Sequence, residues 1–157
     1  MAVSSVPYCK GGVVASTRRI YKALGGQKIL KEPASHYAAL IERVHSGLPY
    51  AAVEAVGERF EIPKDDLLRI LHVPPRTLAR RKKERVLRMD ESDRLLRLGR
   101  IAAMAEEVLG SREKAAAWLR DPNRALGGPR PLDRLDTDLG ARQVEHILGR
   151  IAHGVYS

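Results

Sequence analysis

Apolar residues recur every three or four positions along most of the chain after residue 35, and no stretch of useful length alternates apolar and polar residues. The first spacing places apolar side chains on one face of a helix, whereas alternation would predict a strand. The pattern therefore predicts an all-α protein. The expected apolar faces are Tyr37, Leu40, Ile41 and Val44; Val53, Val56 and Phe60; Leu67, Leu68, Ile70 and Leu71; Leu95, Leu98, Ile101, Ala102, Ala105, Val108 and Leu109; Ala115, Ala116, Trp118 and Leu119; Leu132, Leu135 and Leu139; and Val144, Ile147, Leu148 and Ile151.

Residues that cap or break helices set the expected ends of these elements. Ser35 can cap the first helix, and Gly47 with Pro49 ends it. The acidic residues Asp90, Glu91 and Asp93 suit the start of a long helix over 92–109, because the N-terminal end of a helix favours negative charge. Gly110 is expected to end this long helix. The next helix is expected to begin at Ser111 and to end at the Asp121-Pro122 pair. The last helix is expected to be capped by Asp136 or Thr137 and to end at Gly154.

The first 33 residues show no clear hydrophobic period over most of their length, and we expect them to form an N-terminal extension. Ser16 can cap one short helix there, which would continue to Leu24 and end at the Gly25-Gly26 pair. We expect the rest of this extension to be a basic arm, either solvated or ordered only by a partner.

Residues 63–88 have the outline of a helix-turn-helix. The segment 63–71, PKDDLLRIL, carries the apolar positions of one helix, and His72 and Val73 leave room only for a turn. Residues 74–88, PPRTLARRKKERVLR, then begin a second helix. In such a motif the second helix enters the major groove of DNA.

That second helix is expected to present a cationic face. Pro75 suits its first position, because the N–H group that proline lacks would have no partner there. If Leu78 faces inward, a helical wheel places Arg76, Arg80 and Lys83 on the opposite side. One stripe of the helix therefore points outward.

The charge of the whole chain favours a nucleic-acid partner. Its 157 residues carry a formal net charge of +9 and a sequence pI near 10.0, which attracts polyanions. Arg76 and Arg80 are candidates for base edges, while Lys82, Lys83 and Arg88 suit phosphate. One short helix reads only a few base pairs, so a palindromic operator would need two copies. The candidate DNA-binding residues are Arg76, Thr77, Arg80, Arg81, Lys82 and Lys83, with a merely solvated face as the alternative for Arg81, Lys82 and Arg85.

Membrane, secreted and metal-binding proteins are classes that fit this sequence less well. No segment approaches the ~20 apolar residues of a membrane-spanning helix, and the start lacks the regions of a secretory signal, so we expect a cytoplasmic protein with no membrane partner. Cys9 is the only cysteine, which excludes an intramolecular disulfide and a thiolate metal site. His146 and His153 lie two turns apart on one face of the last helix without a convincing third ligand between them, and no metal site is expected.

No catalytic site or cofactor is predicted. Asp133, Asp136 and Asp138 are explained as helix caps and as counter-charges to nearby arginines. The alternative from the enzyme class is a helical hydrolase or nuclease that uses Asp133 and Asp136. Trp118, the only tryptophan, is most simply a core residue.

The C-terminal part of the chain carries a specific set of motifs. Residues 118–157, WLRDPNRALGGPRPLDRLDTDLGARQVEHILGRIAHGVYS, contain WL, PN-x-ALGG, PL, LDT, GA and GRI-x-HGVYS in order. This run closely resembles the C-terminal toxin-binding domain of the Xre/MbcA/ParS type II antitoxins. Upstream, RTLARRKK at 76–83 and ESDRLLRL at 91–98 look like the Xre-type helix-turn-helix half of the same antitoxins. Pro74 stands where many such domains place a Ser or Asn cap.

The resemblance implies an antitoxin in two parts. After the extension at 1–33, an Xre-like helix-turn-helix domain over 34–101 would bind the operator of its own operon, and a domain over 102–157 would neutralise a toxin. Antitoxins with this ending typically pair with RES-domain toxins, which degrade NAD⁺, so the cofactor would belong to the partner. We expect a homodimer within a larger toxin–antitoxin complex. The implied toxin-binding residues are Trp118, Asn123, Leu126, Arg150, His153, Gly154, Val155, Tyr156 and Ser157.

The end of the chain suggests how neutralisation would work. Gly-Val-Tyr-Ser directly after a helix leaves an aromatic side chain near a free terminus, which suits insertion into a partner's pocket. Our hypothesis is that residues 154–157, with Arg150 nearby, cover or enter the active-site cleft of the toxin. The main alternative is a stand-alone transcription regulator whose C-terminal domain only dimerises.

Overall fold

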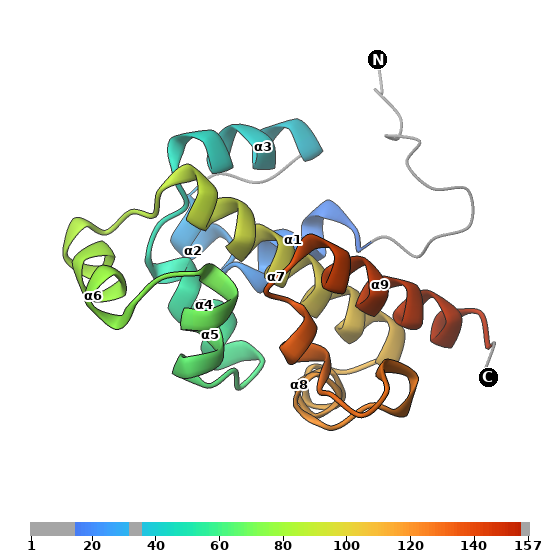
Figure 1. Cartoon of the computed structure of the whole chain (residues 1–157). Helices are drawn as coiled ribbons and strands as arrows, with labels where there is room; N and C mark the ends of the chain where they lie inside the picture. Colours follow the sequence, from blue (N-terminus) through green and yellow to red (C-terminus); the bar gives the residue numbers. More distant parts are fainter. Residues whose placement is uncertain (1–14, 32–35, 155–157) are drawn as a thin grey trace, which may run out of the picture.

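The computed structural model describes residues 15–31 and 36–154, and within these ranges it contains helices and no strand (Figure 1). The predicted all-α fold is confirmed. The α-helices are α1 (Thr17–Ala23), α2 (Gln27–Leu30), α3 (Tyr37–Ser46), α4 (Ala51–Arg59), α5 (Lys64–Leu71), α6 (Pro75–Glu84), α7 (Met89–Leu109), α8 (Arg112–Arg120) and α9 (Asp138–Ala152), with two 3-10 turns, η1 (Arg124–Leu126) and η2 (Pro131–Arg134).

Helix α7 forms the centre of the fold and contacts α1, α3, α5, α8 and α9 (Figure 1). Its predicted apolar stripe is buried, with Leu95, Leu98 and Ile101 each no more than 1% exposed. The helix begins three residues before the expected Ser92, because the Glu91 carboxylate accepts a hydrogen bond from the Arg88 backbone N–H at 2.9 Å and so caps an earlier turn. One hydrophobic core therefore runs through the described chain.

The described part of the N-terminal extension belongs to the fold, and the expected basic arm is wrong for its residues 25–31. Ser16 caps α1 as predicted, accepting a hydrogen bond from the Arg19 backbone N–H at 3.4 Å. However, Ile20, Leu24 and Leu30 are at most 1% exposed, since α1 packs against α7 and α2 against α4. Burying three large aliphatic side chains stabilises the fold by roughly 1.5–3 kcal/mol each, so this segment belongs to the core.

Two residues assigned to apolar faces lie outside the core. Ile41 is 48% exposed, because Leu40 and Val44 form the buried face of α3. Leu139 is 80% exposed. It lies roughly 140° around α9 from the buried Val144, at about 100° of turn per residue. Ser35, the expected cap of α3, falls outside the described residues, and the N-cap position is His36, without a side-chain cap bond.

Backbone contacts with the α3–α4 connection hold the loop after α6. The Leu87 N–H donates to the Leu48 carbonyl at 2.9 Å, and the Tyr50 N–H donates to the Arg85 carbonyl at 3.0 Å. Gly47 adopts φ 92°, and a Cβ at this position would collide with the Leu87 carbonyl. These contacts fix the C-terminal end of α6 relative to α4 and α7.

The caps predicted for the C-terminal helices are present. The Ser111 hydroxyl accepts from the Lys114 N–H at 3.2 Å, and the Thr137 hydroxyl accepts from the Gly140 N–H at 3.1 Å. Gly140 lies against the Arg134 carbonyl, and no side chain fits between them. No helix in the described parts of the chain is long and apolar enough to cross a bilayer.

Candidate nucleic-acid interface and candidate partner surface

Helices α5 and α6 form the helix-turn-helix that the sequence predicts. Helix α5 ends at His72, whose left-handed backbone (φ 56°) reverses the chain. Helix α6 begins after Pro74, which supplies no side-chain cap, and Pro75 takes the first helical position as expected. Helix α6 has ten residues, a length of about 15 Å, and a helix of this diameter fits the major groove of B-DNA.

The exposed face of α6 carries the predicted cationic stripe. Leu78 is buried, at 3% exposure, whereas Arg76, Arg80 and Lys83 are exposed. The Arg80 side chain is 57% exposed, and its Nε atom lies 3.9 Å from the Glu84 carboxylate. A pair this exposed is weak in water, so Arg80 can exchange Glu84 for a base or phosphate. Thr77 is half-buried beside this stripe.

Arg81 does not belong to this surface. Its side chain is 4% exposed, and its Nε atom donates to the Glu91 carboxylate at 2.7 Å while Nη1 donates to Glu84, also at 2.7 Å. These hydrogen bonds hold the guanidinium inside the fold, and they raise its pKa above the ordinary value despite its burial. The prediction that Arg81 contacts DNA is therefore wrong for this fold, since the side chain is buried and its Nε and Nη1 atoms are bonded to Glu91 and Glu84.

Lys82 lies on the side of α6 that faces α4. Its Nζ atom is 3.0 Å from the Glu54 carboxylate and 5.9 Å from the centroid of the Tyr50 ring. The hydrogen bond that Lys82 donates to Glu54 raises the pKa of Lys82. The Lys82 side chain is 65% exposed, so this pair is a solvated one and Lys82 stays a candidate for phosphate.

The candidate partner-binding residues come from α8, η1, the loop around them and the end of α9. In Figure 1 the end of α9 and helix α6 lie at opposite sides of the molecule. Trp118 is partly buried against the core, and Asn123 caps η1 by accepting from the Ala125 N–H at 2.9 Å. At the end of α9, Arg150 is half-buried and His153 and Gly154 are exposed. Residues 155–157, including the predicted Val155, Tyr156 and Ser157, lie outside the described residues.

Leu126 is a core residue. It is only 4% exposed, and its cluster includes buried residues of α8, η2 and α9. A side chain in this position cannot contact a partner without leaving the core. The prediction that Leu126 binds the toxin is therefore wrong for this structure. The leucine of the ALGG motif packs into the core and so holds its loop against the fold.

The aspartates considered for catalysis have structural partners. Asp133 pairs with Arg130 at 2.6 Å, and the Asp136 carboxylate lies 3.9 Å from Arg69. The hydrogen bond from Arg130 lowers the pKa of the Asp133 carboxyl group below its ordinary value. A general acid needs a raised pKa, so Asp133 does not favour the hydrolase hypothesis. Among the described residues, no group of three His, Cys, Asp or Glu side chains is placed to hold a metal ion.

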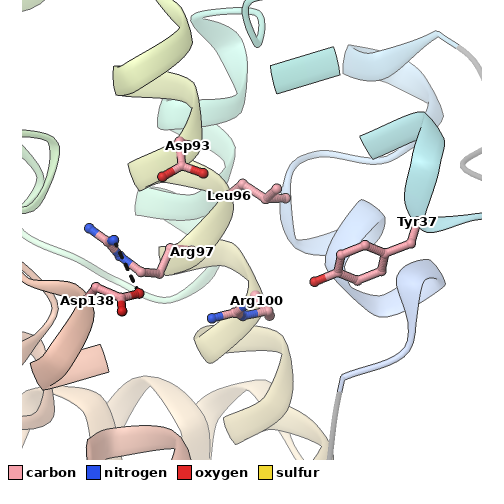
Figure 2. Close-up of a pocket in the computed structure, with 6 residues that line it drawn as sticks. All are labelled: Tyr37, Asp93, Leu96, Arg97, Arg100 and Asp138. Atoms are coloured by element: carbon pink, nitrogen blue, oxygen red, sulfur yellow. Dashed lines mark ion pairs between the residues drawn. The ribbon is translucent and has the colours of Figure 1, made fainter. Parts of the chain in front are cut away.

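A small polar cleft lies between α3, α7 and α9 (Figure 2). Its volume is about 110 Å³, room for one small group. Arg97 faces Asp138 at 3.9 Å, and Arg100 pairs with Glu145 at 2.6 Å. The lining residues supply no nucleophile beside a base, and their ion pairs tie α7 to α9. They are Tyr37, Asp93, Leu96, Arg97, Arg100 and Asp138.

A charged cluster, which sequence reasoning missed, joins α5 to η2. We call Asp66, Arg69, Arg130 and Asp133 the α5–η2 cluster. Asp66 is 7% exposed and accepts hydrogen bonds from Arg130 at 2.9 and 3.2 Å and from Arg69 at 3.0 Å. Asp66 and Arg130 are 64 positions apart, so no local pattern could have paired them.

Both halves of the chain match known antitoxin domains. Residues 39–100 match the family model of the antitoxin Xre-like helix-turn-helix domain. Residues 104–154 match that of the antitoxin Xre/MbcA/ParS C-terminal toxin-binding domain. An antitoxin Xre of Yersinia enterocolitica is 30% identical over 143 residues, which cover 90% of this chain and 93% of that protein. The chain belongs to the Xre/MbcA/ParS family of antitoxins.

Two further similarities support this family. An antitoxin Xre of Photorhabdus laumondii is 35% identical over 127 residues, covering 80% of this antitoxin and 86% of the relative. A chain in the crystal structure of the M. tuberculosis MbcT–MbcA toxin–antitoxin complex aligns with a TM-score of 0.54 and 28% identity, covering 69% of this antitoxin and 96% of that chain. The helical fold is thus shared with a component of a solved toxin–antitoxin complex.

The two family matches divide the candidate residues of the antitoxin. The helix-turn-helix match contains α6 with Arg76, Arg80 and Lys83, and the toxin-binding match contains Trp118, Asn123 and Arg150 and ends at residue 154. In the α5–η2 cluster, Asp66 and Arg69 fall in the first match and Arg130 and Asp133 in the second. The cluster therefore connects the two family domains directly.

Proposed function

We propose that this antitoxin neutralises a RES-domain toxin that degrades NAD⁺ and represses its own operon through α6. The proposal divides the chain at residues 34–101 for DNA and 102–157 for the toxin. It acts by binding, without a catalytic site or cofactor of its own, in the cytoplasm where the operator lies. The observation that carries it is the separation of two surfaces, the cationic helix α6 at one side of the molecule and the end of α9 at the other (Figure 1).

The DNA-binding activity is assigned to the exposed stripe of α6. Arg76 and Arg80 reach base edges, since the arginine fork can bond both O6 and N7 of guanine, and Lys83 contacts phosphate. The formal net charge of +9 supports a polyanionic partner. A homodimer would present two such helices to the two halves of a palindromic operator.

The toxin-binding activity is assigned to the end of α9 and the residues near it. Arg150 and Gly154 lead into residues 155–157, whose tyrosine would enter the toxin's active-site cleft. Trp118 and Asn123 contribute from α8 and the following loop. The family match of this part to a toxin-binding domain supports the assignment. The RES type of the partner rests on the resemblance of the HGVYS ending.

Removal of residues 155–157 tests the proposal. The antitoxin and the protein encoded by the neighbouring gene are expressed together, and growth, cellular NAD⁺ and copurification are measured. The truncated antitoxin should lose protection and leave NAD⁺ depleted, while it still binds a DNA fragment from upstream of its own gene. Arg80→Ala is the matched control, which should protect cells and fail at the operator.

Three results would contradict the proposal. Full protection by the truncated antitoxin would remove the tail from the mechanism. An unchanged NAD⁺ level when the neighbouring protein is expressed alone would exclude this toxin class. Copurification of no protein at all would favour the alternative of a stand-alone regulator whose C-terminal domain only dimerises.

A further inference from the structure

The polar cleft between α3, α7 and α9 is lined by a mostly buried guanidinium that lacks a close acceptor. The Arg97 side chain is 14% exposed, and its Nε atom is buried with no hydrogen-bond partner among the described residues. The carboxylate that Arg97 faces, on Asp138, lies 3.9 Å away, which is beyond hydrogen-bonding distance. A buried donor without a partner is destabilising, so the cleft favours a group that accepts hydrogen bonds from Arg97.

A second arginine lines the same cleft one turn later on α7. Arg100 pairs with Glu145 at 2.6 Å, while its Nε atom is buried and has no partner in the described ranges either. The Tyr37 hydroxyl points from α3 towards Arg100 and interacts with its guanidinium (Figure 2). A hydroxyl oxygen that accepts from arginine can still donate its own proton. Two guanidinium groups and one hydroxyl therefore offer donors to a single small anion.

The carboxylates of the cleft are its more exposed charged groups. Asp138 is 60% exposed and Asp93 is exposed as well, whereas Arg100 is only 31% exposed and Arg97 is mostly buried. Water screens exposed charges, and Asp138 already pairs with Arg142 at 2.8 Å. Asp138 is also the first residue of α9, and the N-terminal end of a helix favours an anion. The inner part of the cleft is therefore positive.

The Asp138 carboxylate sets a requirement for the anion. The hydrogen bond from Arg142 holds the pKa of Asp138 below its ordinary value, so at neutral pH this carboxylate only accepts hydrogen bonds. An anion beside it must bring a proton to donate. At about pH 8 inorganic phosphate keeps one P–OH group, whereas sulfate has none and a phosphate monoester, with its second pKa of about 6, has lost its own. The cleft volume of about 110 Å³ fits such a group.

We propose that this cleft is a binding site for inorganic hydrogen phosphate. Arg97 and Arg100 bind its charged oxygens, Tyr37 donates from the opposite wall, and Asp138 accepts from its P–OH group. Arginine suits this role because its planar fork matches the oxygens of phosphate. The inference does not depend on the proposed function, since none of these residues belongs to the exposed stripe of α6 or to the candidate toxin-binding residues.

Titration calorimetry of the full-length antitoxin with sodium phosphate tests the proposal. The buffer is Tris chloride at about pH 8 and constant ionic strength, because a chain with a formal net charge of +9 attracts any anion. Sodium sulfate and adenosine monophosphate, a phosphate monoester, are titrated in the same way. We expect one phosphate to bind per chain, at least about tenfold more tightly than sulfate or the monoester, because only phosphate satisfies Asp138.

Arg97→Gln should weaken phosphate binding at least about tenfold, because it removes a charged donor. The matched control is Arg94→Gln, which makes the same change of charge one turn earlier on α7, at 27% exposure and outside the cleft. The control should keep the wild-type affinity for phosphate. Thermal unfolding followed by circular dichroism shows whether each variant is folded.

Asp138→Asn tests the selection of the anion separately. An amide can donate to an oxyanion that carries no proton, so this variant should lose most of the preference for phosphate over sulfate. Because the Asp138 side chain is 60% exposed, the substitution is compatible with folding and provides the test if Arg97→Gln does not fold.

Three results would overturn the inference. The first is the absence of saturable phosphate binding at millimolar concentrations. The second is equal affinity of the wild-type chain for phosphate, sulfate and adenosine monophosphate, which would show general attraction to a basic protein. The third is an equal loss of phosphate affinity in Arg97→Gln and Arg94→Gln. None of these results bears on binding to operator DNA or to a toxin, so failure here is distinct from failure of the proposed function.

Discussion

Arg81 donates from Nε to Glu91 at 2.7 Å inside the fold, and this contact joins α6 to the start of the central helix α7. Both side chains are at most 5% exposed. Glu91 also accepts from the Arg88 N–H, so the same carboxylate caps α7 and holds α6. A cation in the middle of a basic run is therefore a structural residue, and its loss should disturb the fold.

Arg81→Met should lower the free energy of unfolding by about 3 kcal/mol or more, because it leaves Glu91 buried without its main charge partner. Denaturant unfolding followed by circular dichroism measures this change. Arg80→Met, one residue away and 57% exposed, is the control and should change stability by less than about 0.5 kcal/mol. Equal effects of the two substitutions would contradict the structural role.

Acid should destabilise the antitoxin. Burial raises the pKa of Glu91, but hydrogen bonds from Arg81 and the Arg88 N–H outweigh it, and the net pKa lies below the ordinary 4.5. The hydrogen bond from Arg130 likewise lowers the pKa of Asp133 below 3.8. Folded carboxyl groups with lowered pKa bind fewer protons than unfolded ones, so their stabilisation is present above the ordinary pKa and is lost as pH falls.

Urea unfolding at a series of pH values measures this loss, which we expect between about pH 5 and pH 2. Asp133→Asn should reduce the dependence on pH, because that group no longer titrates. A free energy of unfolding that stays constant across this range would contradict the proposed contribution of both carboxylates.

Leu126→Ala should destabilise the fold by about 2–5 kcal/mol, since it empties a position that is 4% exposed. Thermal and denaturant unfolding measure the loss. Leu139→Ala is the matched control, because Leu139 is 80% exposed and its truncation removes little buried surface. A full loss of toxin affinity by Leu126→Ala with normal stability would restore Leu126 as a contact residue.

Gly140→Ala should cost about 3 kcal/mol, because the new Cβ meets the Arg134 carbonyl and α9 must shift away from η2. Gly149→Ala, in the same helix with no atom within 4 Å of the added Cβ, should instead stabilise by about 0.5–1 kcal/mol through helix propensity. The melting temperatures of the two variants show whether each substitution destabilises or stabilises the fold as expected. A higher melting temperature for Gly140→Ala would show that Gly140 does not lie directly against the Arg134 carbonyl.

Arg80→Ala should weaken binding to operator DNA at least about tenfold, with a smaller loss on random DNA, because a base contact discriminates between sequences. Lys83→Ala should weaken binding to operator DNA and to random DNA equally, and it should reduce the slope of log K against log salt by about 0.9. Fluorescence anisotropy at several salt concentrations measures the two affinities and the slope. Equal losses on the two DNAs for Arg80→Ala would make it a phosphate contact.

The local pattern predicted most of the fold because helices are specified by neighbouring residues. Apolar spacing and capping residues predicted α1 and α3 to α9 with small errors at their ends, and Pro74-Pro75 marked the start of α6. The exposed stripe of Arg76, Arg80 and Lys83 also follows from a helical wheel once Leu78 is placed inward. Their assignment to DNA stays a prediction.

The errors have a common physical cause. A single sequence does not show which charged residues find partners across the fold, so Arg81 was grouped with its exposed neighbours. It does not show which leucine of a loop is covered, so Leu126 was assigned to a surface. Residues 15–31 contain too few aliphatic side chains to show a clear helical period in the sequence. Their burial depends on contacts with α4 and α7, which the sequence alone does not show.

The sequence by itself determined the helices, the helix-turn-helix and the motifs of the family, since each depends on residues within a few positions of one another. Only the tertiary structure decided that Arg81 is internal, that residues 15–31 belong to the core, and that Asp66 meets Arg130. These depend on burial and on contacts between residues far apart in the chain. Such contacts form only when α7 brings the helices together, and no local spacing encodes them.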